Sequence, residues 1–176
     1  YHVDQDQAQR VEETARALVG QLVDSWRLDR QDSERWLHWA ALLHEIGLVI
    51  AHSQYHKHGA YLVEYSDLPG FSLGDQRFLS VLVRCHRRKF RKSFVETLPA
   101  GMRENAIQLC TLLRLSVLLH RNRSRNAAPA LRASAHNDSI RLDFPSAWLK
   151  NHPLTLADLN LEKKYLKSAG LKLEYS

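Results

Sequence analysis

Several features that would place a protein in a specialised class are scarce or absent in this sequence. It has two cysteines, Cys85 and Cys110, and no secretory leader, so we expect a reducing, cytoplasmic location and no disulfide framework. It has no apolar run near the roughly 20 residues that a membrane span needs, and no repeat. The only methionine is Met102 and the chain begins YHVDQ, so we interpret it as a piece of a longer protein. The remaining composition, 44% hydrophobic and 25% charged, is typical of a soluble globular domain.

The formal charge of +6 is concentrated in one segment. Residues 84–92, RCHRRKFRK, contain six Lys or Arg and no acid, while the rest of the chain has equal numbers of basic and acidic side chains. Such a patch attracts polyanions such as nucleic acids, membrane surfaces or phosphate chains.

Apolar residues at three- and four-residue spacing predict a helical first part. Asp4, with Gln7 three positions later, is a capping pair for a first helix that continues to about Trp26. Residues 35–43 are apolar on most faces and predict a central, buried helix that Gly47 helps to end. Further helices are expected in HGAYLVEYS, after the capping pair Ser72 and Asp75, and over residues 103–120.

The pattern changes after HRNRSRNAAP, which we interpret as a domain boundary. Residues 130–144 predict two strands around a turn, a helix capped by Thr155 and Asp158 follows, and LKLEY alternates like a third strand. We therefore predict a mainly α fold, with a helical bundle over residues 1–125 and a small α+β domain over residues 126–176 that contains about three antiparallel strands.

The stretch AALLHEIGLVIAHSQYHKHGAYLV, residues 40–63, holds four histidines and a glutamate. His44 and Glu45 could ligate a divalent ion. The alternative is a buried, hydrogen-bonded pair that fixes the junction between two helices.

The basic patch is the stronger candidate for a binding site, although a charge run is often only a solvated surface. Arg84, Arg87, Arg88 and Lys92 would share one face of a helix at this spacing. Guanidinium and ammonium groups bind phosphate oxygens, and Arg does so in a bidentate manner. The predicted phosphate-binding residues are Arg84, His86, Arg87, Arg88, Lys89 and Lys92, with His52, His56, Lys57 and His58 as a second wall.

Several of these motifs together resemble a known family. The order of LLHEIG, HKHGAYL, LVRCHRRK and LLRLSVLLHRNR is similar to that of an HD-domain helical bundle. YHVDQDQAQRV, SDLPGF, LDFPSAWL and LNLEKKYL extend the resemblance over nearly the whole chain, to the C-terminal half of bacterial exopolyphosphatases of the Ppx/GppA family.

This resemblance implies a parent enzyme whose N-terminal, actin-like domains carry the catalytic carboxylate and bind Mg²⁺. The C-terminal half would bind inorganic polyphosphate and form a homodimer, with no cofactor of its own. The metal positions of an active HD domain match His2, His44, Glu45 and Val117, and a valine cannot ligate a metal, so the resemblance implies a degenerate metal site.

We therefore predict a polyphosphate-binding and dimerisation region of an exopolyphosphatase that is not catalytic alone. The alternatives are an autonomous, metal-dependent HD nucleotide phosphohydrolase and the C-terminal region of a guanosine pentaphosphate phosphohydrolase. A nucleic-acid-binding module is a further alternative, but the sequence contains no recognised nucleic-acid motif.

Overall fold

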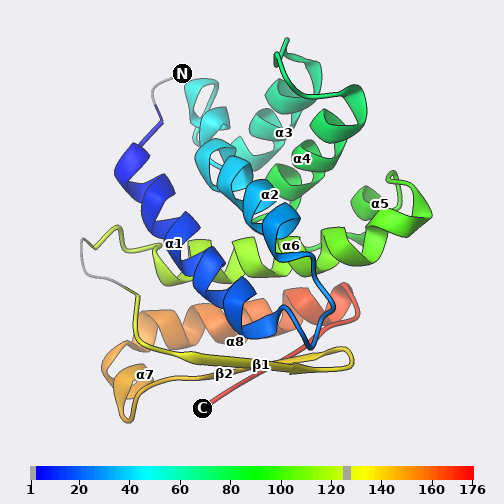
Figure 1. Ribbon diagram of the computed structural model, residues 1–176. Helices are drawn as coiled ribbons and strands as arrows, with labels where there is room; N and C mark the ends of the chain where they lie inside the picture. The colour runs from blue at the N-terminus through cyan, green and yellow to red at the C-terminus, as the bar shows by residue number, and fades with distance from the viewer. Residues whose placement is uncertain (1–2, 125–127) are drawn as a thin grey trace.

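The computed structural model describes residues 3–124 and 128–176 (Figure 1). Helices dominate it, and a three-stranded sheet lies in the C-terminal part, as the sequence predicts. The elements are α1 (Gln5–Leu22), α2 (Arg30–Leu43), a 3₁₀ turn (Ile46–Val49), α3 (Tyr55–Tyr65), α4 (Leu73–Cys85), α5 (Lys92–Val95), α6 (Ala100–Leu119), β1 (Arg132–His136), β2 (Ser139–Asp143), α7 (Trp148–Asn151), α8 (Pro153–Ser168) and β3 (Lys172–Tyr175).

Two of the predicted helix starts are confirmed in detail. The Asp4 carboxylate accepts a hydrogen bond from the backbone N–H of Gln7 at 3.0 Å. The Gln7 side chain does not return a bond to Asp4 but donates to the carbonyl oxygen of His120 at 2.9 Å. At α4, Ser72 and Asp75 form a complete capping box.

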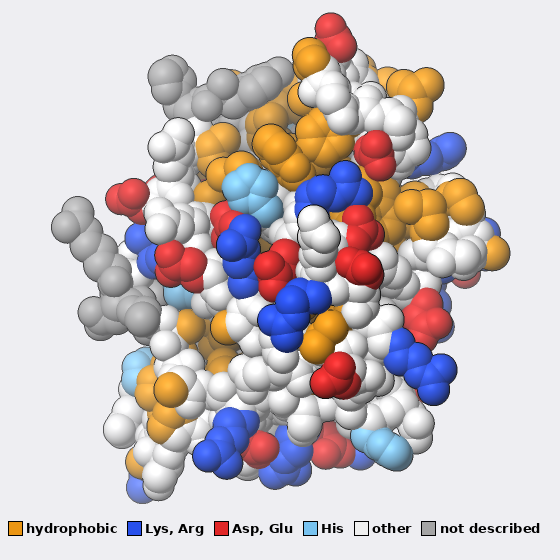
Figure 2. All heavy atoms as spheres, viewed as in Figure 1, with side chains coloured by type: hydrophobic (Ala, Val, Ile, Leu, Met, Phe, Trp, Pro, Cys, Tyr) orange, Lys and Arg blue, Asp and Glu red, His pale blue; other side chains and the backbone are white. Residues whose placement is uncertain are grey.

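The central helix is α6 rather than the segment 35–43 that the sequence favours. Helix α6 packs against α1, α2, α4, α5 and α8, and lies between the upper helices and α8 in Figure 1. Helix α2 reaches the surface, where Trp39 is 37% exposed and meets the ring of Phe71 edge-on. Figure 2 shows apolar side chains gathered in the upper part of this face, whereas charges of both signs mix below them.

Two glycines allow the 3₁₀ turn to lie directly on α3. A Cβ on Gly47 would lie 1.9 Å from the Tyr55 carbonyl oxygen and 2.4 Å from the Gly59 nitrogen. Only a residue without a side chain permits this approach, so Gly47 positions the histidine-rich segment rather than simply ending a helix.

The sheet has the order β1-β2-β3. Strands β1 and β2 form an antiparallel hairpin, but β3 pairs with β2 in parallel, with Ile140 opposite Leu173. The expectation of three antiparallel strands is therefore wrong for β3, because α8 returns the chain to the same end of the sheet as in a crossover connection. Helix α8 begins at Pro153, two residues before the predicted Thr155 cap.

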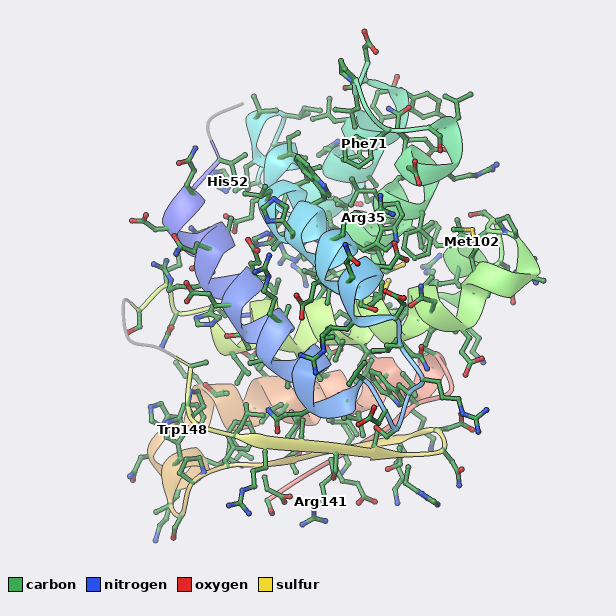
Figure 3. All side chains as sticks on the ribbon, in the orientation of Figure 1. Arg35, His52, Phe71, Met102, Arg141 and Trp148 are labelled. Carbon is green, nitrogen blue, oxygen red and sulfur yellow. The ribbon has the colours of Figure 1, made fainter. Side chains whose placement is uncertain are left out.

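The sheet packs one face inward. Ile140 and Leu142 are fully buried, while Arg141 between them projects from the outer face (Figure 3). One continuous core cluster contains residues from both sides of the predicted boundary at 125–126. The division into two domains stays a prediction. Within the described residues, no helix combines the length and apolarity required to cross a bilayer.

Candidate functional site

The sequence predicts that the helix before the basic segment, residues 84–92, continues through it, but the helix ends near the start of the segment. Helix α4 ends at Cys85, and α5 starts at Lys92. Between them, residues 86–91 form a loop in which Arg88 has a left-handed backbone, with φ of 63°. A common helical face for Arg84, Arg87, Arg88 and Lys92 is therefore wrong.

The loop nevertheless brings most of the predicted residues together in a groove of about 360 Å³. We call it the basic groove, and its lining residues are His52, Ser53, Gln54, His56, Lys57, Arg84, Arg87, Arg88, Lys89, Arg91 and Phe94. None of these residues is acidic. Figure 3 labels His52, which lies near the end of the molecule remote from the sheet.

Aromatic rings hold two of the arginines in the basic groove. The Arg84 guanidinium lies 4.5 Å from the centroid of the Phe94 ring, and that of Arg87 lies 4.4 Å from Tyr55. In the part of the chain that the structure describes, no salt bridge involves a cation of the basic groove. These cations remain available to an external anion.

Three predicted binding residues lie outside the basic groove. His58 is half-buried on α3 and does not line it. His86 is buried and faces a second cavity. Lys92 lines a different depression, where its Nζ would lie 3.0 Å from a Cβ on Gly170. The loop that ends α4 separates Lys92 from Arg84 and Arg87, because the helical spacing stops at Cys85.

A second space, the inner cavity, adjoins the basic groove and shares His52, Arg87 and Arg88 with it. Its volume is about 340 Å³, and it is lined by Gln7, Glu45, Leu48, His52, Tyr55, His86, Arg87, Arg88, Arg114, Val117, Leu118, Arg121, Arg123, Glu162 and Tyr165. Three of its arginines are already paired with carboxylates: Arg114, Arg121 and Arg123.

Arg114 of α6 holds the loop of residues 86–91 in place. Its side chain is 2% exposed, and its guanidinium forms a bidentate ion pair with the carboxylate of Glu162 on α8. The same group donates hydrogen bonds to the carbonyl oxygens of Cys85 and Arg88, the latter at 2.7 Å. The shape of the basic loop is therefore tied to a residue near the end of the chain.

Three buried histidines cluster next to the basic groove, and one of them, His56, lines it. His44 and His86 pack edge-to-face at 5.3 Å, and His56 and His86 at 6.4 Å. His44 and His86 donate Nδ1–H to the carbonyl oxygens of Ala41 and Val83, each at 2.6 Å. Their Nε2 atoms and Nδ1 of His56 are buried and have no hydrogen-bond partner among the described residues.

These surroundings keep the three imidazoles neutral at pH 7. Burial lowers the pKa of His44 and lowers that of His86 well below its usual value. Burial, reinforced by the nearby Arg84 and Arg87, lowers the pKa of His56 to about 4. His56 can therefore offer a hydrogen bond to a ligand at pH 7 but no positive charge.

The degenerate metal positions do not fit a metal ion. Glu45 pairs with Arg123, which also binds Asp4 at 2.8 Å, so an arginine already neutralises the carboxylate. Val117 lines the same inner cavity and offers no ligand. No three His, Cys, Asp or Glu residues within residues 3–124 and 128–176 are placed to hold a metal. His2 lies outside the described residues.

The interpretation of His44 and Glu45 as a hydrogen-bonded pair is wrong. Their nearest nitrogen and oxygen atoms are 3.9 Å apart, which is too long for a hydrogen bond. Each side chain has its own partner instead, Ala41 for the histidine and Arg123 for the glutamate.

Sequence reasoning did not identify Tyr55, Phe94 and Arg114 as parts of the site. A usable signal existed for Arg114, because an arginine within an apolar helix must find a buried carboxylate or several carbonyl groups. Tyr55 and Phe94 gave no such signal, since their contacts with Arg87 and Arg84 form only when the loop folds back.

Comparisons with known proteins point to one family. The family model "Ppx/GppA phosphatase, domain III" matches residues 1–163. A guanosine-5'-triphosphate,3'-diphosphate pyrophosphatase of Pseudoalteromonas translucida is 35% identical over 173 residues, which cover 98% of this chain and 35% of that protein. A protein of the same name from Aeromonas hydrophila is 34% identical over 97% of this chain and 34% of its own length.

The chain thus spans about a third of the length of these curated relatives. The relatives take their names from guanosine pentaphosphate, whereas the resemblance in the sequence favoured the exopolyphosphatase side of the family. The match of the family model and the extent of the identity show that the chain belongs to the Ppx/GppA phosphatase family.

Proposed function

We propose that this chain is the polyphosphate-binding region of an exopolyphosphatase and that the basic groove holds the phosphate chain. The observation that carries the proposal is the lining of the groove, which combines six Lys or Arg with two histidines and no carboxylate. The parent enzyme would release terminal phosphate from inorganic polyphosphate at another site.

The geometry suits a chain of phosphates better than a single ion. Polyphosphate offers repeated charged oxygens and no base edges, so spaced guanidinium groups suffice to bind it. The rings of Phe94 and Tyr55 hold Arg84 and Arg87 in place, which lowers the entropy lost when they bind a ligand. Many weak contacts would slow the dissociation of long chains.

Catalysis belongs elsewhere in this proposal. The pairing of Glu45 with Arg123 argues against an autonomous, metal-dependent phosphohydrolase. The chemistry and the Mg²⁺ would come from the actin-like domains of the parent chain, and two copies of the protein would form a homodimer.

Guanosine pentaphosphate is the second candidate ligand. The names of the relatives favour it, because both describe action on guanosine-5'-triphosphate,3'-diphosphate. Its phosphates could use the same groove, since they present the same oxygen chemistry.

The test is equilibrium binding of polyphosphate to this chain over a range of salt concentrations. The variant replaces Arg84, Arg87 and Arg88 by Ala, and the matched control replaces Arg16, Arg30 and Arg35, which are surface arginines with carboxylate partners. We expect the groove variant to lose roughly tenfold or more in affinity and part of its salt dependence, and the control to change little.

Two outcomes would overturn the proposal. Equal losses in the groove variant and the control would show that only net charge matters. Comparable binding of oligonucleotides and polyphosphate at equal charge would instead favour a nucleic-acid-binding module.

A further inference from the structure

A second groove continues from the basic groove between α3 and α4, and its chemistry is different. The two grooves share Lys57, Arg84 and Phe94. We call the second one the tyrosine groove; it has a volume of about 250 Å³ and is lined by Lys57, Ala60, Tyr61, Glu64, Tyr65, Arg77, Ser80, Val81, Arg84, Phe94 and Thr97. An extended ligand could therefore pass from one groove into the other.

Two exposed tyrosines form one wall of the tyrosine groove. Tyr61 and Tyr65 are 62% and 69% exposed, and their ring centroids are 4.9 Å apart. They lie one helical turn apart on α3, and Lys57 lies one turn before them. Exposed aromatic rings beside a cationic groove are a platform on which nucleobases stack.

Glu64 supplies a hydrogen-bond acceptor at the same place. It lies on α3 between the two tyrosines, lines the tyrosine groove, and accepts a hydrogen bond from Ser80 through Oε2 at 3.2 Å. No other hydrogen bond or salt bridge to its carboxylate is present among the described residues. A carboxylate with spare acceptor capacity favours a base with adjacent N–H donors.

Guanine has this donor arrangement on its Watson–Crick edge, at N1–H and the 2-amino group. Adenine presents a lone pair at N1, which a carboxylate repels. The cations Lys57, Arg77 and Arg84 around the tyrosines fit an anionic ligand with an aromatic part better than an apolar protein surface.

We propose that the tyrosine groove is a guanine-base subsite, and that the chain binds guanosine polyphosphates with their phosphates in the basic groove. The base would stack on Tyr61 and Tyr65 and donate hydrogen bonds to Glu64. This inference rests on the proposed binding of phosphate chains in the basic groove, to which it adds recognition of the nucleoside.

The test compares three probes, GTP, ATP and tripolyphosphate, at one salt concentration. GTP and ATP carry the same triphosphate, so the basic groove treats them alike and a difference in affinity reports the base. We expect wild type to prefer GTP over ATP by roughly tenfold, as a charged hydrogen bond allows. The change Glu64→Gln should reduce that preference to less than about threefold.

A second variant tests the stacking. Replacing Tyr61 and Tyr65 by Ala should lower the affinity for both GTP and ATP by about tenfold and leave the affinity for tripolyphosphate unchanged. The matched control is Tyr175→Ala, which removes a tyrosine on β3, at the other end of the molecule.

The outcomes separate this inference from the proposed function. Equal affinities of wild type for GTP and ATP, or unchanged GTP affinity in the tyrosine variant, would overturn the base subsite while polyphosphate binding stands. If replacing Arg84, Arg87 and Arg88 by Ala leaves the affinity for tripolyphosphate unchanged, the proposed phosphate binding in the basic groove is wrong. The proposed base subsite, which rests on it, is then wrong as well.

Discussion

Arg114 and Glu162 form a buried ion pair that joins the central helix α6 to α8, 48 residues later in the chain. Both side chains are almost fully buried. The arginine also holds the carbonyl oxygens of Cys85 and Arg88, so a single guanidinium group connects the core, the C-terminal helix and the basic loop.

Removing Arg114 alone should destabilise the protein strongly. The change Arg114→Met leaves Glu162 buried without a counter-charge, and we expect a loss of about 3–5 kcal/mol in the free energy of unfolding. Adding Glu162→Leu removes the stranded charge and should recover part of that loss. Urea denaturation measures both, and a double variant less stable than Arg114→Met would contradict this account.

Gly47 should tolerate no side chain. In Gly47→Ala the new Cβ overlaps the Tyr55 carbonyl oxygen, so the 3₁₀ turn must move away from α3. We expect a loss of about 3 kcal/mol or more in the free energy of unfolding, at the upper end of overpacking effects. The control is Gly101→Ala in the first turn of α6, where the new Cβ would have no described atom within 4 Å apart from its chain neighbours and the backbone of its own helix. That change should stabilise by about 0.5 kcal/mol, and similar melting temperatures for both variants would refute the steric argument.

The buried histidines should make the fold sensitive to acid. In the unfolded chain, histidine side chains bind protons with a pKa near 6.5, whereas the pKa of His56 in the folded protein is about 4. Between these values the unfolded state binds more protons, so the free energy of unfolding falls as the pH drops. His44 and His86, whose pKa values are also lowered, act in the same direction.

Thermal melting between pH 7 and pH 5 measures this effect. The variant His56→Asn should lose less stability over that range than wild type, since one of the responsible groups is gone. Parallel curves for the two proteins would show that the His56 imidazole is not a source of the acid sensitivity.

Metal ions should have no effect on the stability of the wild-type chain. Because Arg123 occupies the Glu45 carboxylate, we expect the same melting temperature with EDTA as with Mn²⁺ or Zn²⁺. A rise in melting temperature that saturates at one ion per chain would contradict the conclusion that the degenerate metal positions do not bind a metal. In Arg123→Ala, a newly acquired metal response would show that the arginine had blocked the site.

The local features of the fold could be predicted well from the sequence. Asp4 and Ser72 cap helices because their short side chains reach backbone N–H groups three residues later, which is a property of nearby residues only. The parallel pairing of β3 could not be predicted in this way. It depends on how α8 crosses the sheet, and an alternating pattern is the same for either strand direction.

The candidate site likewise combines features that could be predicted from the sequence with features that could not. Its charge follows directly from the sequence, because six cations in nine residues must attract anions wherever they lie. Its shape does not, since the left-handed turn at Arg88 and the hydrogen bonds from Arg114 decide which cations converge. The placement of Lys92 away from the groove follows from that turn.

The ion pair between Glu162 and Arg114 limits how far the protein can be truncated. A fragment cut at the predicted boundary near residue 125 would keep every residue that lines the basic groove. It would also leave the guanidinium that shapes the loop without its counter-charge, and would expose the part of the core covered by α8 and the sheet. The cationic residues and the scaffold that orients them are encoded in different parts of the chain, so we expect that a fragment that preserves the shape of the basic groove must extend past residue 162.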